Sequence, residues 1–307
     1  MTYSIILPVY NEQENIQNMY DRILPVMRKL GTHEIIFVND GSYDSTLHLL
    51  KQLHAKDSSV KVISFSRNFG HQAAVSAGLN MCTGEKIAIL DGDLQDPPEV
   101  LPTFFEKLDE GYDAVYAIRT KRKEGIFKRF AYSAFYRMLK SIANIDIPLD
   151  SGDFCVLDRK IVNAINSLPE RNRFIRGIRS WVGFKQIGIT YARGARAAGE
   201  SKFTMKKLFK LAFDGIFSFS YVPLQAMFYV GLMALFFSLA GTIWAIYQKF
   251  FTTNYAEVPG FATTIILVLF VGGLQLFSLG VVGEYMRRMF DEIKQRPQYI
   301  IDEVVGV

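Results

Sequence analysis

Residues 89–99 read ILDGDLQDPPE and place Asp91, Asp93, Asp96 and Glu99 directly after an apolar run. A short apolar run bounded by turn-forming residues predicts a buried β-strand. Carboxylates this close repel one another, so the cluster indicates either a cation among them or side chains that point to different places. Side chains at positions i and i+2 of a strand end share a face, so Asp91 and Asp93 can reach one cation. Asp96 and Glu99 suit the first turn of a helix, which the two prolines begin.

The same succession of a short apolar run, a polar turn and a helical stretch recurs along residues 1–200. Strands are expected over 4–10, 34–38, 61–66, 86–90 and 113–118, with helices between them, among them 12–30 and 71–81. Strands that alternate with helices predict βαβ units around a mainly parallel sheet, covered on both faces. Ligands of such sheets bind outside the carboxyl ends of the strands.

The expected strand ends carry polar and acidic side chains, including Glu12, Asp40 and Asp91. Neither G-x-G-x-x-G nor G-x-x-x-x-G-K-[ST] occurs, so a dinucleotide-dependent oxidoreductase and a P-loop NTPase are not supported. An acidic rim can still bind a diphosphate through Mg²⁺ or Mn²⁺, which takes one or two carboxylates and fills its other positions with phosphate oxygens and water. The four histidines show no zinc-ligand spacing, and two cysteines imply no disulfide framework.

The second half of the chain carries long stretches without charge. Half of the 307 residues are hydrophobic, and no charged residue occurs over 215–248 or over 258–283. A membrane span needs about 20 apolar residues, so spans are expected near 221–247 and 259–283. Two buried core helices are the alternative, but two long uncharged runs in succession favour membrane spans.

The flanking charges predict the orientation of these spans. The linker 251–258 has no Lys or Arg, whereas both outer flanks are basic, with Lys202, Lys206, Lys207 and Lys210 before the spans and Arg287, Arg288, Lys294 and Arg296 after them. By the positive-inside rule both ends face the cytoplasm and the linker faces outward. We therefore expect a multi-pass protein of the cytoplasmic membrane, with a cytoplasmic domain over 1–200, a juxtamembrane amphipathic helix over 201–220, two spans over 221–285 and a cytoplasmic tail over 286–307.

Two basic stretches, 119–144 and 202–219, have apolar residues at helical spacing. Basic amphipathic helices are typical of an anionic membrane surface, and an ordinary core-facing helix with a solvated basic face is the alternative. The net charge of +5 is accompanied by no nucleic-acid-binding motif, so nucleic acid is not an expected partner. Four glycines of the second span would allow close helix contact and hence a homo-oligomer, namely Gly272, Gly273, Gly280 and Gly283.

Six motifs, in order, carry a family resemblance. SIILPVYNEQENI (4–16), IIFVNDGSYDST (35–46) and ILDGDLQDPPE (89–99) resemble the nucleotide-binding motifs of family-2 glycosyltransferases with the type-A (GT-A) fold. SRNFGHQAAVSAG (66–78), DSGDFCVLDR (150–159) and RAAGESKF (196–203), followed by two spans, resemble the polyprenyl-phosphate glycosyltransferases, the group of bactoprenol glucosyltransferases and dolichol-phosphate-mannose synthase. The resemblance covers essentially the whole chain.

The resemblance implies roles for the matching residues. The nucleoside would be held by Pro8, Tyr10, Glu12 and Asp40, with Asp40 on the base, and Asp91 and Asp93 would bracket Mg²⁺ or Mn²⁺ and the diphosphate. Gln95 would lie near the metal or the sugar, and Arg196 and Lys202 would reach phosphate oxygens. Asn39 departs from the pattern, because many relatives carry a second Asp there. A structural reading also exists for Glu12 as a helix N-terminal acid, for Asp40 as a turn residue and for His71 as a first-turn helix residue.

The reaction expected from these residues is displacement at the anomeric carbon of a hexose. The resemblance alone implies UDP-glucose as the preferred donor. A lipid phosphate is already anionic, so it can attack with little or no help from a base. Arg119 and Arg129 are expected near this acceptor phosphate, because guanidinium forks match phosphate oxygens. Asp153 could orient the acceptor or act as a base, with Asp150 as its competitor. The resemblance also implies inversion of the anomeric centre.

Three other functions remain open. A processive polysaccharide synthase would need more spans and a Q-x-x-R-W motif, and residues 178–181 lack its Gln. Transfer to a lipid alcohol such as diacylglycerol would use the same fold. A non-catalytic membrane anchor or flippase component belongs to another class, and the presence of both Asp91 and Asp93 argues against it.

Overall fold

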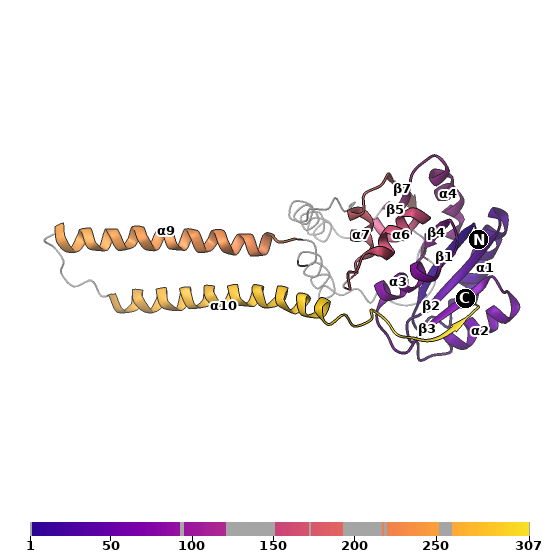
Figure 1. The fold of residues 1–307 in the computed structure, drawn as a ribbon, viewed down its shortest axis with the longest axis horizontal. Helices are drawn as coiled ribbons and strands as arrows, with labels where there is room; N and C mark the ends of the chain where they lie inside the picture. Colours follow the sequence, from indigo (N-terminus) through magenta and orange to yellow (C-terminus); the bar gives the residue numbers. More distant parts are fainter. Residues whose placement is uncertain are drawn as a thin grey trace. The chain divides into compact units, whose positions relative to one another are not determined.

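The computed structural model describes residues 2–92, 95–120, 151–171, 173–192, 217, 220–251 and 260–306. The chain forms two compact units, shown in Figure 1. One comprises residues 1–140, 145–204 and 295–307 and is called the α/β domain below; the other comprises 141–144 and 205–294 and is called the helical hairpin.

The α/β domain is built on one mixed sheet. Its described strands are β1 (Tyr3–Val9), β2 (His33–Asn39), β3 (Val60–Phe65), β4 (Lys86–Ile89), β5 (Ala114–Thr120), β6 (Ser151–Asp158), β7 (Gln186–Ala192) and β8 (Ile301–Val305), in the order β7-β5-β6-β4-β1-β2-β3-β8. Strands β4, β1, β2 and β3 run parallel, as do β5 and β7. Strand β6 is inserted antiparallel between β4 and β5, and β8 is antiparallel to β3. The expected mainly parallel α/β sheet is confirmed.

Helices cover both faces of this sheet. Helices α1 (Ile16–Leu30), α2 (Thr46–Lys56) and α4 (Leu101–Asp109) pack on one face, with the short 3-10 helix η1 (Pro98–Val100) before α4. Helices α3 (His71–Met81), α6 (Arg159–Ser167) and α7 (Ile175–Trp181) pack on the other. Strand β1 shows why both faces are apolar: Leu7 joins the core under α1, and Ile6 joins the core under α3.

Helix α3 lies close to the sheet because of a glycine. A Cβ atom at Gly78 would overlap the side chain of Ile6 on β1. Glycine therefore allows the helix backbone to approach the strand. His71, the first residue of α3, lies at the carboxyl end of the sheet because a short loop joins it to the end of β3.

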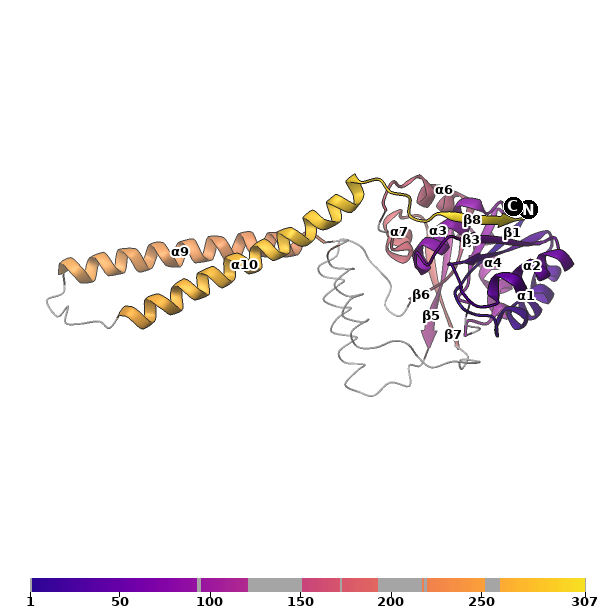
Figure 2. The ribbon, with the colours of Figure 1, turned by 90° about the horizontal axis from the view of Figure 1, so that it is seen from below.

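The C-terminal segment returns to the α/β domain rather than forming a separate tail over 286–307. Helix α10 continues to Ile293, and residues 295–307 belong to the α/β domain, where β8 pairs with β3. Figure 2 shows β8, in yellow, alongside β3. The ring of Tyr299 stacks on Phe65 with 4.9 Å between centroids, and its hydroxyl accepts a hydrogen bond from Asn80. These contacts join the segment to β3 and α3.

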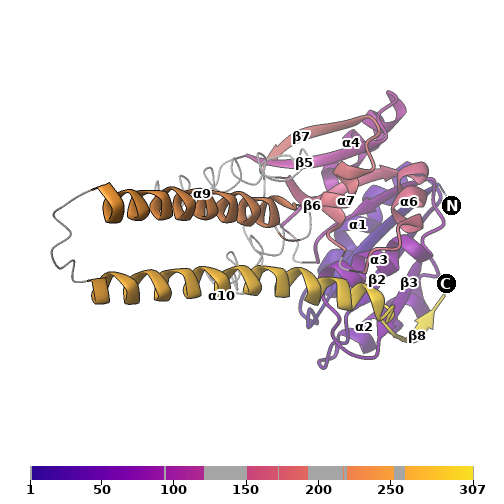
Figure 3. The ribbon, with the colours of Figure 1, turned by 60° about the vertical axis from the view of Figure 1, so that its left-hand side comes forward.

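The helical hairpin consists of α9 (Val222–Phe251) and α10 (Gly260–Ile293), which run alongside each other in Figures 1 and 3. The stretches Val222–Trp244 and Leu267–Ile293 have mean hydropathies of 1.9 and 1.8 and are long and apolar enough to cross a membrane. None of the most apolar part of either stretch is buried within the structure. The predicted amphipathic segments 119–144 and 202–219 lie almost entirely outside the described residues.

Candidate active site

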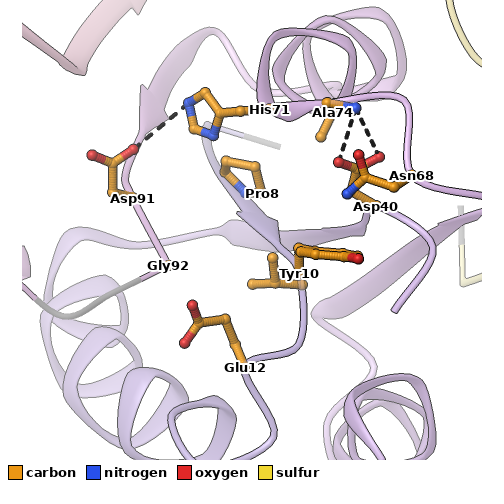
Figure 4. A pocket seen from close by; sticks show the side chains of 11 residues that line it. Pro8, Tyr10, Glu12, Asp40, Asn68, His71, Ala74, Asp91 and Gly92 are labelled. Carbon is orange, nitrogen blue, oxygen red and sulfur yellow. Dashed lines mark hydrogen bonds and ion pairs between the residues drawn. The ribbon is translucent and has the colours of Figure 1, made fainter. Parts of the chain in front are cut away.

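A cleft of about 330 Å³ opens at the carboxyl ends of β1, β2 and β4 (Figure 4). It is lined by Pro8, Val9, Tyr10, Glu12, Asp40, Asn68, Gly70, His71, Ala74, Asp91 and Gly92. The in-register parallel pairing of Val9 with Asn39 brings the ends of β1 and β2 to the same edge. Five of the residues expected from the sequence, Pro8, Tyr10, Glu12, Asp40 and Asp91, therefore meet in one cleft.

Asp40 forms one buried end of the cleft. Asp40 is 4% exposed, and its carboxylate accepts hydrogen bonds from the main-chain N–H groups of Phe69, at 2.7 Å, and Gly70, at 3.0 and 3.2 Å. Burial raises the pKa of Asp40 above its ordinary value, although the N–H donors oppose this change. A carboxylate has about four acceptor positions, so Asp40 can connect the β3–α3 loop and still accept a hydrogen bond from a ligand.

Tyr10 lies at the same end of the cleft as Asp40. The loop that carries Tyr10 is held in place by the next residue, Asn11. The backbone N–H of Asn11 donates to Ser42 Oγ at 2.9 Å, and the side chain of Asn11 accepts from the N–H of Tyr43 at 3.1 Å. Asn11 has a φ of 53°, a conformation that Asn tolerates better than most residues. The loops after β1 and β2 are thus joined. Tyr10, which is 41% exposed, lines the cleft.

His71 lies at the opposite end, between two carboxylates. Its Nε2 atom is 3.7 Å from Oδ1 of Asp91 on one side and 3.4 Å from Oδ2 of Asp153 on the other. Burial lowers the pKa of His71, but the hydrogen bond and charge of Asp153 and the charge of Asp91 outweigh it, so the pKa is raised. The sequence alone assigned His71 only to the first turn of a helix. The structure shows that this turn places the imidazole ring beside Asp91. The end of the cleft formed by His71 and Asp91 is called the acidic end below.

Arg176 lies behind this end, paired with Asp153, and neither residue is among those that line the cleft. No sequence motif indicated Arg176. Its Nη2 and Nε atoms lie 3.1 and 3.3 Å from Oδ1 of Asp153, and both side chains are only 19% exposed. Burial alone would raise the pKa of Asp153, but the charge of Arg176 and the contact with His71 hold it well below its ordinary value. A carboxylate with so low a pKa is a poor proton acceptor near neutral pH. The environment of Asp153 therefore favours a role as a fixed anion over one as a base.

The acidic end has the composition and spacing of a divalent metal site. His71, Asp91 and Asp153 each offer one ligand atom, and these three atoms lie within 4.8 Å of one another. Carboxylate oxygens suit Mg²⁺ and Mn²⁺, and imidazole is a further ligand for transition metals such as Mn²⁺. The residues present thus fit a divalent ion, with Asp91 as the one predicted ligand among the described residues, while Asp93 lies outside them.

Two further carboxylates of the 89–99 stretch, Asp96 and Glu99, point elsewhere. Asp96 is buried, and its Oδ1 accepts a hydrogen bond from the hydroxyl of Tyr191 on β7. Glu99 lies in η1 and forms a bidentate pair with Arg22 of α1, at 2.8 and 3.1 Å. Asp96 and Glu99 therefore stabilise the packing of strands and helices, and of these described carboxylates only Asp91 lines the cleft.

Several expected site residues cannot be placed in the cleft. Gln95 is half-buried and is not among the lining residues. Arg119 lies at the carboxyl end of β5, in register with Tyr191 of β7. Outside the described residues lie Asp93, Arg129, Asp150, Arg196 and Lys202. The roles of all these residues remain predictions.

Comparison with known families matches two parts of the chain. Residues 4–165 match Glycosyl transferase family 2, and residues 222–289 match the GtrB C-terminal hairpin. The first match covers the sheet from β1 to β6 with its cleft, and the second covers most of α9 and α10.

Similar proteins extend over nearly the whole chain. An uncharacterized glycosyltransferase of Bacillus subtilis, YkcC, is 44% identical over 307 residues, which cover 99% of this chain and 94% of the relative. A prophage bactoprenol glucosyl transferase homolog of Escherichia coli K12 is 40% identical, with 99% of both chains covered. The bactoprenol glucosyl transferase of Shigella phage SfX is 40% identical, with 98% and 99% covered.

Solved structures are more distant. Glucosyl-3-phosphoglycerate synthase of Mycobacterium tuberculosis, in complex with Mn²⁺, UDP-glucose and phosphoglyceric acid, has a TM-score of 0.48 and 20% identity, covering 70% of this chain and 77% of that one. TarS (residues 1–349) of Staphylococcus aureus has a TM-score of 0.42 and 18% identity, covering 62% and 58%.

Proposed function

Since this chain belongs to glycosyl transferase family 2 and is a glycosyltransferase, we propose that it transfers glucose from UDP-glucose to a polyprenyl phosphate, undecaprenyl phosphate, at the cytoplasmic face of a membrane. The acceptor is supported by relatives named bactoprenol glucosyl transferase, which align over nearly their whole length. A membrane location is supported by two helices that are long and apolar enough to span one.

The observation that carries the proposal is the polarity of the cleft. One end presents the ring of Tyr10 and the buried acceptor Asp40, which suit a planar base with N–H groups. The other end presents Asp91 and His71, with Asp153 against His71, and these groups suit a diphosphate bound through a divalent ion and the hydroxyl groups of a sugar. A nucleotide sugar has its base, diphosphate and hexose in this same order.

The divalent ion would be held by Asp91 together with Asp93, with His71 beside them. When bound, it supplies positive charge that stabilises a departing diphosphate. In this proposal Asp40 and Tyr10 hold the base. Arg176 and His71 hold Asp153 in place near the sugar.

The proposed step needs no general base. An oxygen of the acceptor phosphate forms the new bond to the anomeric carbon while the bond from that carbon to the diphosphate oxygen breaks, and the electron pair leaves with UDP. Attack opposite the leaving group inverts the anomeric centre. A hydroxyl acceptor would lose a proton in the same step and would gain from a base. The ion-paired state of Asp153 therefore favours the phosphate over a lipid alcohol such as diacylglycerol.

The test is a product assay with the full-length protein in detergent. Radiolabelled UDP-glucose, UDP-galactose and GDP-mannose are each incubated with undecaprenyl phosphate or with diacylglycerol in the presence of Mn²⁺, and lipids are separated by thin-layer chromatography. We expect label from UDP-glucose on undecaprenyl phosphate alone. Label on diacylglycerol with none on the lipid phosphate would contradict the proposed acceptor. Transfer from another donor would contradict only the proposed sugar or nucleotide.

A further inference from the structure

We propose that Arg176 is a positioning residue that neutralises Asp153 and thereby lets an anionic acceptor approach the carboxylates of the cleft. The inference rests on the proposed function in one respect, since it takes the acceptor to be a lipid phosphate. The new element is Arg176, whose positive charge would allow the acceptor phosphate to bind beside the diphosphate and the carboxylates.

Helix α7 holds Arg176 in a defined position. Ile175 and Ile178, on either side of it in sequence, are buried in the core under α3, α6 and α7. The N–H of Ile175 donates to Oε1 of Gln72 at 2.8 Å, and Gln72 follows His71 on α3. The two helices are thus joined at the ends that carry His71 and Arg176, and these side chains contact different oxygens of Asp153.

The charges explain why such a residue is needed. Asp91 lines one end of the cleft and Asp153 lies next to it, against His71. The proposed reaction brings a diphosphate and an acceptor phosphate to the same region. A divalent ion at Asp91 would offset the charge on the diphosphate side. Asp153, with a carboxylate oxygen within 4.8 Å of one of Asp91, would repel an acceptor phosphate that approaches this region. The guanidinium of Arg176, which stays charged at any relevant pH, offsets that repulsion without removing the carboxylate.

Two donors of Arg176 on Oδ1, together with His71 on Oδ2, also fix the orientation of Asp153. A guanidinium that donates from both Nε and Nη2 to one oxygen restricts rotation of the carboxylate. Lysine would retain the charge but offers a single point of contact. Charge and orientation can therefore be separated by substitution: Arg176→Lys keeps the first, Arg176→Gln keeps hydrogen bonding without the charge, and Arg176→Ala keeps neither.

The experiment measures the apparent KM for undecaprenyl phosphate and for UDP-glucose with full-length variants in detergent. We expect Arg176→Ala and Arg176→Gln to raise the KM for the lipid phosphate by about 30-fold, the low end of the effect of removing one partner from a buried charge pair. The KM for UDP-glucose should change by less than about 3-fold by the same reasoning. Arg176→Lys should recover most of the affinity for the lipid. The matched control is Arg171→Ala, which removes an arginine of the loop before α7 that donates to the main chain of Arg296.

A double-variant comparison decides whether Arg176 acts through Asp153. If it neutralises this carboxylate, Arg176→Ala in an Asp153→Asn background should change the KM for the lipid by no more than about 3-fold, because the charge to be offset is gone. An equal loss in both backgrounds, or an equal rise in the KM for both substrates, would overturn the inference. Binding of undecaprenyl phosphate without donor, followed by microscale thermophoresis, gives the same comparison independently of turnover. Absence of lipid-phosphate product with the wild-type protein would instead refute the proposed function.

Discussion

The Nε2 atom of His71 lies 3.4 Å from Oδ2 of Asp153, although the two residues belong to a helix and a strand that are far apart in the sequence. The same nitrogen lies 3.7 Å from Asp91. The ring of His71 therefore lies between the carboxylates of Asp91 and Asp153. Substitution of His71 consequently tests how these groups act together.

Substitution of His71 by Ala should lower glucosyl transfer by about 10–100-fold, the range typical of residues that orient metal ligands. The variant should also need more Mn²⁺ for half-maximal activity, because the cluster of His71, Asp91 and Asp153 loses one of its three candidate ligand atoms. The affinity for UDP alone, measured by calorimetry without metal, should change little, since Tyr10 and Asp40 lie at the other end. His48→Ala on α2, an exposed histidine, is the control. Unchanged metal dependence in His71→Ala would contradict this role.

Removal of divalent metal should abolish activity. EDTA-treated wild-type protein is expected to be inactive and to recover with Mn²⁺ or Mg²⁺, because the diphosphate then regains its counter-charge. Asp91→Asn and Asp93→Asn should each remain nearly inactive at every metal concentration while keeping the circular dichroism spectrum of the wild type. Asp21→Asn on α1 changes an exposed acid far from the cleft and serves as control. Full turnover in EDTA would refute metal dependence.

The buried Glu34 predicts how stability depends on pH. Its Oε2 pairs with Nζ of Lys61 at 2.7 Å, and its Oε1 accepts from Ser4 at 2.5 Å and from the N–H of Thr83 at 2.6 Å. Burial raises the pKa of Glu34, but these donors and the charge of Lys61 outweigh it, so the pKa is lowered from 4.5. The stabilisation is therefore complete above pH 4.5 and is lost as the pH falls through the lower, folded-state pKa.

Glu34→Gln should reduce the free energy of unfolding by about 3 kcal/mol at pH 7, because Lys61 loses its buried partner. The difference in Tm between wild type and variant, measured by scanning calorimetry, should shrink as the pH is lowered below 4.5. Glu110→Gln removes an exposed partner of Lys107 and should have little effect at any pH. A difference that grows toward acidic pH would contradict the assignment.

The orientation in the membrane can be tested with one cysteine. The native thiols, Cys82 and Cys155, are both buried in the α/β domain. In a background that lacks them, a cysteine at Thr253, in the linker without Lys or Arg, should react with an impermeant maleimide on intact cells. A cysteine at exposed Tyr43 should react only after lysis. The reverse pattern would place the α/β domain outside.

Local patterns in the sequence determined most of the fold and one half of the site. Short apolar runs that end in turn residues marked β1 to β5, because a strand buried on both faces needs such a run. Parallel strands bring their carboxyl ends to one edge, so the sequence was enough to predict a common cleft for Tyr10, Asp40 and Asp91. Two long uncharged runs marked the hairpin, because only apolar side chains suit a membrane interior.

Tertiary structure alone decided the rest. The antiparallel insertion of β6, which brings Asp153 beside His71, and the return of β8 to β3 depend on pairing between distant segments, for which the sequence has no local signal. Arg176 likewise could not be identified from the sequence, because its partner Asp153 is on another element and α7 contains no motif typical of a functional site. A charge pair is formed by distance in space, and its effect on Asp153 exists only once α3, β6 and α7 are packed together.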